Sequence, residues 1–281
     1  MQVLKTSPER LFRLAQMRIE RADVGSTATW TIGDGGPRVL LIHGFRGDHH
    51  GLLGIAGAMP EVRFVIPDLP GFGKTPALTS ASNLDAYGQW LVQFSHQAGQ
   101  FDAVLAHSFG TLVLANALSN QMHAKKVLLQ NPITSNPRKG LIAKAADLYY
   151  ELGSDPKSNL LRSQLVVRGM SIALSTTIRP GLRRFIHQQH ANYFSTFDNN
   201  QALYQAYQAA SSSNVLDYVA GLPKALRIVA GERDVVAPLS GQKKLAELTS
   251  APLRVIPKTG HLTHYETPAE VAEELAHLLE S

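Results

Sequence analysis

Cysteine is absent from the 281-residue sequence, which excludes a disulfide framework, a thiolate nucleophile and a cysteine-ligated zinc site. Glycine and proline number only 22 and 15, which excludes collagen-like and low-complexity chains. No run of about 18 uninterrupted apolar residues occurs, and residues 1–14 lack the apolar segment of a signal peptide. We therefore expect a cytoplasmic protein without a membrane span.

Strong charge of one sign is also missing. Lys and Arg number 27 against 22 Asp and Glu, a formal net charge of +5, and no block of five to eight basic residues occurs. We therefore expect no nucleic-acid partner. With 44% hydrophobic residues, the chain can build a packed core, which separates it from disordered chains.

Short apolar runs rich in β-branched residues predict strands that are buried on both faces. Segments with helical spacing separate them, and this alternation predicts an α/β fold with a mostly parallel central sheet and flanking helices. Residues 17–32 alternate around glycines and predict an antiparallel hairpin at the start of the sheet. The predicted strands are residues 38–43, 63–67, 101–107, 126–130, 226–230 and 253–256, and the predicted helices are residues 84–98, 111–118, 241–248 and 268–279.

One interval is too long for a simple crossover. Residues 132–224 separate two predicted strands, whereas a crossover between parallel strands needs only about a dozen residues. We interpret this segment as an inserted helical cap, or lid, over the carboxyl ends of the strands, and a helical subdomain without function as the alternative. Its predicted helices are residues 141–152, 160–175, 182–190 and 201–211.

The cap also carries most of the positive excess, because residues 132–222 contain nine basic and five acidic residues. This suggests substrates with an anionic group, although a solvated helical face is the simpler explanation.

The segment Ala106-His107-Ser108-Phe109-Gly110 lies where a predicted strand ends and a helix begins. A serine on such a sharp turn projects its hydroxyl above the sheet, and the turn requires small residues two positions before and after it. Gly110 meets this requirement, and Ala106 replaces the usual glycine with one extra methyl group. Alternatively, Ser108 is only a helix N-cap.

Four other predicted strands end in motifs typical of catalytic sites. His43-Gly44-Phe45 places a backbone N–H where an oxyanion would need a donor, and the N–H of Phe109 would be a second donor. The remaining motifs are the glycine-rich loop of residues 68–73, Gly231-Glu232-Arg233-Asp234, and Gly260-His261.

Together these motifs resemble the α/β-hydrolase fold superfamily, in its serine-nucleophile subset with a helical cap. The resemblance implies a core formed by residues 1–131 and 225–281, with the cap at residues 132–224. It implies Ser108 as nucleophile, His261 as general base and Asp234 as the orienting acid, in the chain order expected of this superfamily. Phe45 and Phe109 would supply the oxyanion hole through their backbone N–H groups.

Competing candidates are less well placed. Glu232 lies at the start of its loop, away from the position of the family acid, and Asp68 in a glycine-rich turn is expected to bind its own backbone. Histidines occur in pairs at residues 49 and 50, 187 and 190, and 261 and 264, without acidic ligands at a recognised metal-binding spacing. We therefore expect neither a metal nor a cofactor.

The expected activity is hydrolysis of a carboxylic ester of a small molecule through an acyl-enzyme. Carbon–carbon bond hydrolysis, thioester hydrolysis and lactone hydrolysis remain alternatives, as does a small-molecule receptor without catalysis. Aromatic residues of the cap are expected to line part of the substrate pocket. The residues named for this pocket are Arg46, His107, Tyr149, Tyr150 and His264.

Overall fold

The computed structural model describes residues 1–79, 82–135 and 141–281. One sheet of eight strands runs through the core in the order β1-β2-β4-β3-β5-β6-β7-β8. Strand β2 pairs antiparallel with β1 and β4, and all other neighbours are parallel. The predicted α/β fold and its opening hairpin are therefore confirmed. The strands are β1 (Ile19–Arg21), β2 (Thr29–Ile32), β3 (Arg38–Ile42), β4 (Arg63–Pro67), β5 (Ala103–His107), β6 (Lys126–Gln130), β7 (Ala225–Gly231) and β8 (Leu253–Ile256).

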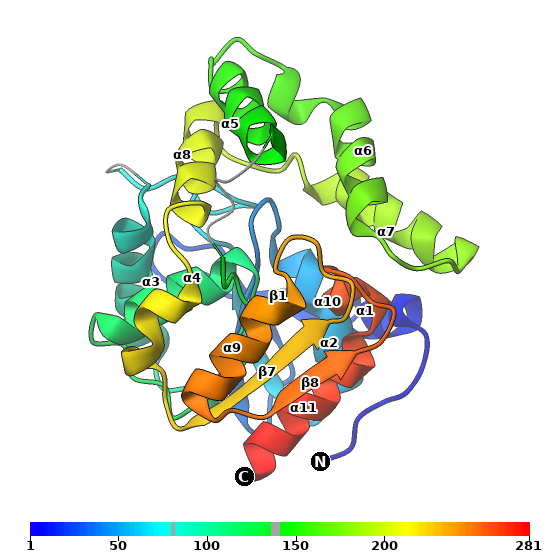
Figure 1. Ribbon diagram of the computed structural model, residues 1–281. Coiled ribbons are helices and arrows are strands. Elements are labelled where there is room, and N and C mark those ends of the chain that lie inside the picture. Colours follow the sequence, from blue (N-terminus) through cyan, green and yellow to red (C-terminus); the bar gives the residue numbers. More distant parts are fainter. Residues whose placement is uncertain (80–81, 136–140) are drawn as a thin grey trace.

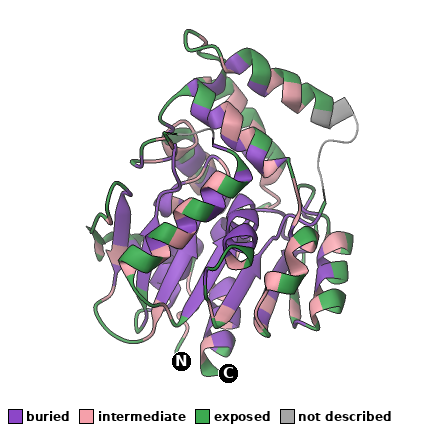
Figure 2. Ribbon diagram, turned by 90° about the vertical axis from the view of Figure 1, so that its left-hand side faces the viewer, coloured by how far each residue is buried: buried purple, intermediate pink, exposed green. Residues whose placement is uncertain are grey.

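Helices cover both faces of the sheet (Figure 1). They are α1 (Pro8–Gln16), α2 (Leu53–Ala58), α3 (Leu84–Ala98), α4 (Phe109–Ser119), α9 (Leu239–Thr249), α10 (Thr263–Glu266) and α11 (Pro268–Glu280), with the 3₁₀ turns η1 (His49–Leu52) and η3 (Val215–Gly221). Successive side chains of β3 point to opposite faces, so that Val39 and Leu41 join one apolar cluster and Leu40 and Ile42 another. This double burial explains the apolar runs of the central strands, and Figure 2 shows these strands buried inside a more exposed shell. The edge strands β1 and β8 are less buried and contain exposed charged residues, Glu20, Arg21 and Arg254.

Between β6 and β7 the chain leaves the core and forms a helical insertion (Figure 1). The insertion comprises α5 (Leu141–Gly153), η2 (Leu160–Arg162), α6 (Gln164–Leu174), α7 (Pro180–Tyr193) and α8 (Asn200–Ala210). It lies over the carboxyl ends of the parallel strands, where α/β sheets bind ligands.

The prediction of a single helix over residues 160–175 is wrong, because this segment forms two separate helical elements. The chain is extended at Ser163, with ψ of 118°, so the segment divides into the short turn η2 and helix α6. Helix α1 was not expected at all, although Ser7 caps its first turn by accepting a hydrogen bond from the Arg10 N–H.

The end of the cap is hydrogen-bonded to the core. The Gly73 N–H donates to the Thr196 carbonyl at 2.8 Å, and the Asp198 N–H donates to the Gly71 carbonyl at 3.0 Å. Phe72 and Phe197 form an isolated antiparallel bridge between these segments. The chain just after α7 therefore pairs with the glycine-rich loop that follows β4.

Across the described residues, we find no helix with both the length and the apolar character needed to cross a bilayer.

Candidate active site

Ser108 occupies the sharp turn between β5 and α4. Its backbone has φ of 52° and ψ of −120°, a conformation that L-residues seldom adopt. The Ser108 N–H donates to the Gln130 carbonyl of the neighbouring strand, and the Thr111 hydroxyl donates to the Ser108 carbonyl. These bonds hold a strained serine in place, which is a feature of functional sites.

The turn depends on a glycine. A β-carbon on Gly110 would lie 2.6 Å from the His43 carbonyl oxygen and 2.8 Å from that of Ile42. Helix α4 can therefore start this close to β3 only because residue 110 has no side chain. Ala106, at the other small-residue position of the turn, is fully buried in the core.

His261 joins Ser108 to Asp234. Its Nε2 lies 2.7 Å from the Ser108 Oγ, and its Nδ1 lies 2.8 Å from the Asp234 Oδ2. All three side chains are buried, and each comes from a loop at the carboxyl end of a different strand. Because a carboxylate can only accept hydrogen bonds, Nδ1 carries the proton and Nε2 is free to accept from the serine hydroxyl.

The carboxyl group of Asp234 is held as an anion. Burial alone would raise its pKa, but the electrostatic attraction of the His261 ring and several hydrogen bonds lower the pKa below its ordinary value. The N–H groups of Val236 and Ala237 each donate to Oδ1 at 2.8 Å, and the Asn131 Nδ2 donates to Oδ2 at 2.7 Å. Hydrogen-bond donors therefore surround both oxygens of the Asp234 carboxylate.

Sequence reasoning missed Asn131 and its partner Thr263, whose hydroxyl donates to the Asn131 amide oxygen. Asn131 is fully buried and has φ of 46°. It directly follows β6, at the edge of the sheet where the other motifs end, and this position is the signal that could have identified it. Glu232, the alternative acid, instead accepts from the Lys258 N–H on an exposed loop.

The loop after β3 approaches Ser108 closely. A β-carbon on Gly44 would lie 3.0 Å from the Ser108 Cβ and 2.9 Å from the His107 Nδ1, so only glycine fits there. His43 fixes this loop, because its Nδ1 donates to the Gly44 carbonyl and its Nε2 accepts from the Leu69 N–H, both at 2.8 Å. Burial lowers the pKa of His43, which keeps the ring neutral in this pair of bonds.

A cavity of about 300 Å³ borders Ser108 and His261. The cap contributes Tyr150, Met170, Ala173, Leu174 and Phe194 to its wall, and the core contributes mainly the loops after β3, β5 and β8. Four of the residues predicted for the substrate pocket line this cavity: Arg46, His107, Tyr150 and His264.

Tyr149 does not line the cavity in the described structure. Its neighbour on α5, Tyr150, faces the cavity, and consecutive helical residues point about 100° apart. The Tyr149 hydroxyl instead donates to the Leu160 carbonyl, and its ring packs edge-on against Tyr150.

Two further histidines surround His261. His107 and His264 are buried, with ring centroids 4.2 Å apart, and the His107 Nε2 lies 3.2 Å from the His261 carbonyl oxygen. Burial, with a smaller effect of nearby His261, lowers the pKa of His107 to about 3. Burial likewise lowers the pKa of His264 well below its ordinary value. Both rings are therefore neutral, and His107 can donate to the loop that carries His261.

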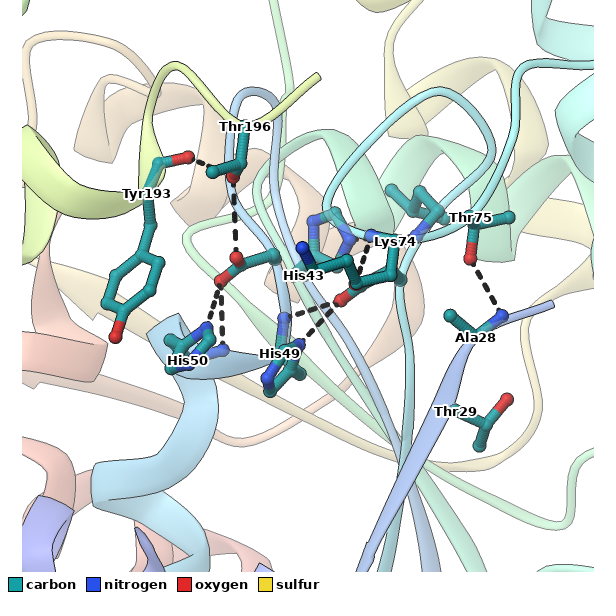
Figure 3. Close-up of polar contacts among 12 residues, drawn as sticks. Ala28, Thr29, His43, His49, His50, Lys74, Thr75, Tyr193 and Thr196 are labelled. Atoms are coloured by element: carbon teal, nitrogen blue, oxygen red, sulfur yellow. Dashed lines mark hydrogen bonds and ion pairs between the residues drawn. The ribbon is translucent and has the colours of Figure 1, made fainter. Parts of the chain in front are cut away.

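A polar network beside the cavity reaches the cap through the hydrogen bond from the Thr196 hydroxyl to Asp48 (Figure 3). Asp68 accepts from the backbone N–H and the ring of His49 and from the Lys74 N–H, and Asp48 accepts from the backbone N–H and the ring of His50. One possible ligand atom from each of Asp48, His49 and His50 lies within 4.8 Å of the other two. The Nδ1 atoms of His49 and His50 are already hydrogen-bonded to the carboxylates of Asp68 and Asp48, so we assign these residues a structural role.

Solved structures with similar folds include two hydrolases. An esterase from Exiguobacterium antarcticum is 17% identical, with a TM-score of 0.74 over 91% of this chain and 96% of its own. The enol-lactonase from Burkholderia xenovorans LB400 is 13% identical, with a TM-score of 0.77 over 93% of this chain and 100% of its own. At these identities the likeness establishes the fold alone.

Among curated proteins, the dihydrolipoyllysine-residue acetyltransferase component of the acetoin cleaving system of Pseudomonas putida is 26% identical over 256 residues. The match covers 86% of this chain but only 63% of the length of that relative. The model of the alpha/beta hydrolase family matches residues 39–274. This range contains Ser108, Asp234 and His261 and the loops that carry them, and it begins after the hairpin that precedes β3. The chain therefore belongs to the alpha/beta hydrolase family.

Proposed function

We propose that this protein is a serine hydrolase that cleaves carboxylic esters of small molecules. The observation that carries the proposal is the unbroken hydrogen-bonded chain from the Ser108 Oγ through His261 to the Asp234 carboxylate. A serine hydroxyl is scarcely ionised near neutral pH, so it needs an adjacent base, and the base needs a partner that fixes its tautomer. This geometry supplies both.

In the acylation step, the Ser108 Oγ attacks the ester carbonyl carbon while its proton passes to the His261 Nε2. The ester C–O bond then breaks, and the same proton moves to the departing alkoxide. A water molecule activated by His261 next attacks the acyl-enzyme, releases the acid and restores the serine. Asp234 stays ionised throughout and stabilises the imidazolium.

The oxyanion hole in this proposal consists of the backbone N–H groups of Phe45 and Phe109. Among the described residues, neither N–H donates to another protein group, so both are available to a substrate oxygen. Phe109 is also the first residue of α4, where the positive end of the helix dipole adds to the effect. Each donor is expected to contribute about 3 to 4 kcal/mol to transition-state stabilisation.

A fluorophosphonate probe tests the proposal directly, because it labels only activated serines. We expect labelling of the wild type and none of Ser108→Ala. Ser95→Ala is a matched control, since Ser95 lies on α3 and donates within its own helix. Folded wild-type protein that resists the probe would refute the hydrolase assignment and favour a receptor without catalysis.

The bond that is cleaved requires a second comparison. Nitrophenyl esters of increasing acyl length, thioesters, lactones and dienoic carbon–carbon substrates can be ranked by kcat/KM. The acyl chemistry of Ser108 serves all of them, and the likeness to an enol-lactonase makes lactones the first alternative. We expect the nitrophenyl esters to rank highest. Turnover of the carbon–carbon substrates alone would refute the ester preference while retaining the nucleophile.

A further inference from the structure

Arg46 is the single arginine or lysine among the described residues that line the cavity. It directly follows Phe45, so its side chain starts one residue from the proposed oxyanion hole. The residue is only 3% exposed. Arginine carries a positive charge in proteins, so a full positive charge is buried in the wall of the cavity that borders Ser108.

This charge lacks a counter-ion in the described structure. Arginine ion pairs join Arg21 to Asp23 and Arg227 to Glu274, and none involves Arg46. Its Nε donates to the Phe194 carbonyl and one N–H of Nη2 donates to the Leu161 carbonyl. Carbonyl dipoles offset only part of the desolvation cost of a buried charge.

Donor capacity also remains unused. Two of the five guanidinium N–H groups serve the cap carbonyls, and Nη1 has no hydrogen-bond partner in the described structure. The two N–H groups of Nη1 and the second N–H of Nη2 are left over. The end of the guanidinium therefore keeps the two parallel donors that match a carboxylate.

The backbone at Arg46 is also unusual. Its φ is 58°, in the left-handed region, which glycine adopts more readily than a residue with a β-carbon.

Tyr150 brings a second donor from the cap to the same place. Tyr150 lines the cavity, its side chain is buried, and its hydroxyl lies close to the Arg46 guanidinium. Burial raises the pKa of Tyr150 and the nearby charge of Arg46 opposes this rise, so the two side chains are neighbours. The phenol remains protonated and able to donate.

We propose that Arg46 and Tyr150 form a subsite for a carboxylate on the acyl part of the substrate, so that the preferred esters are monoesters of dicarboxylic acids. This inference rests on the proposed esterase function. Asp48 also lines the cavity, but its carboxylate is engaged by His50 and Thr196 and forms no ion pair with Arg46.

Matched substrates test the subsite. The mono-4-nitrophenyl esters of glutarate, adipate and pimelate are each compared with the same ester whose free carboxylate is capped as a methyl ester. We expect kcat/KM to favour at least one carboxylate form by about tenfold or more. The preference should persist in 0.5 M salt, because salt weakly screens a buried pair but strongly screens long-range attraction by the basic cap.

Arg162 provides the matched control variant. Its guanidinium also donates to cap carbonyls, those of Ser195 and Phe197, but it does not line the cavity. Arg46→Gln should lower the ratio of carboxylate to capped kcat/KM about 10- to 100-fold, and Arg162→Gln should leave that ratio as in the wild type. Arg46→Lys, which keeps the charge without the fork, should retain part of the preference.

The outcomes separate the subsite from the catalytic proposal. Equal kcat/KM for both ester forms in the wild type, or equal effects of the two glutamine variants on the ratio, would overturn the subsite while leaving the esterase intact. If no ester is hydrolysed, calorimetry of glutarate, adipate and pimelate with Ser108→Ala still tests it. Binding that disappears in the Ser108→Ala, Arg46→Gln double variant supports the subsite, and binding independent of Arg46 overturns it.

Discussion

Mild acid should destabilise this fold through histidines that are buried in the neutral form. Burial lowers the pKa of His107 to about 3, and burial together with nearby His187 lowers the pKa of His190 to about 3. The unfolded chain binds a proton at each site near pH 6.5, whereas the folded protein does so only near pH 3. Between these values the unfolded state holds more protons, so stability falls as the pH falls.

The size of the effect follows from the pKa values. Each pH unit below 6.5 removes about 1.4 kcal/mol per histidine, so each of the two costs about 2 kcal/mol at pH 5, or about 4 kcal/mol together. His43 and His264 act in the same direction. Asp234 affects the stability only at lower pH, because the pKa of its carboxyl group lies below 3.8. Against a typical total of 5–15 kcal/mol, the histidine effect is large.

Urea denaturation at several pH values between 5 and 8 measures this effect. The free energy of unfolding should fall by about 4 kcal/mol or more from pH 7 to pH 5. His190→Gln should reduce the slope of the unfolding free energy against pH by the amount that corresponds to about one proton. This substitution should disturb little else, because Nδ1 of His190 bonds only to the Ser171 hydroxyl and its Nε2 lacks a partner in the described structure. Substitution of the exposed His123 is the control. A free energy that changes by less than 1 kcal/mol would refute the reasoning.

Three further substitutions probe the site and the cap. Asn131→Ala removes a donor to Asp234 and should lower kcat for nitrophenyl esters about tenfold, while circular dichroism shows an intact fold. An unchanged kcat would contradict the proposal that Asn131 supports Asp234. Gly110→Ala places a β-carbon against the His43 carbonyl and should cost about 1–3 kcal/mol in urea denaturation, and a neutral result would show that α4 can shift. Tyr193→Ala removes a ring stacked on a core histidine and should speed proteolysis of the cap, whereas an unchanged rate would show that the stack does not restrain it.

Local sequence signals were sufficient for the strands and for the turn at Ser108. A strand buried on both faces is apolar along most of its length, so the central strands β3 to β6 stand out against their surroundings. Strand β8, at the edge of the sheet, has an exposed Arg254 and gives a weaker signal. The turn at Ser108 also needs small neighbours at fixed positions, a requirement that Gly110 displays in the sequence itself.

Features that depend on distant contacts were not predictable in this way. Helix α1 is short and carries charged residues, and its apolar side is buried because α2, α7 and α11 pack against it. The supporting role of Asn131 depends on Asp234, which lies 103 positions away in the chain. The sequence was sufficient to name Arg46 as a pocket residue. Its burial was not predictable, because the carbonyl groups of Leu161 and Phe194 that bind its guanidinium come close to it only in the folded chain.

The pairing of residues 71–73 with residues 196–198 limits how the cap can be exchanged. A lid from another protein could be grafted between the two ends of the insertion, next to β6 and β7. Here such a graft would replace the partners of Gly71, Phe72 and Gly73, whose loop is tied through Leu69 to His43 and so to the residues beside Ser108. A graft that retains residues 193–198 of this chain should preserve the nucleophile's surroundings, and one that replaces them should disturb catalysis even where the new lid folds.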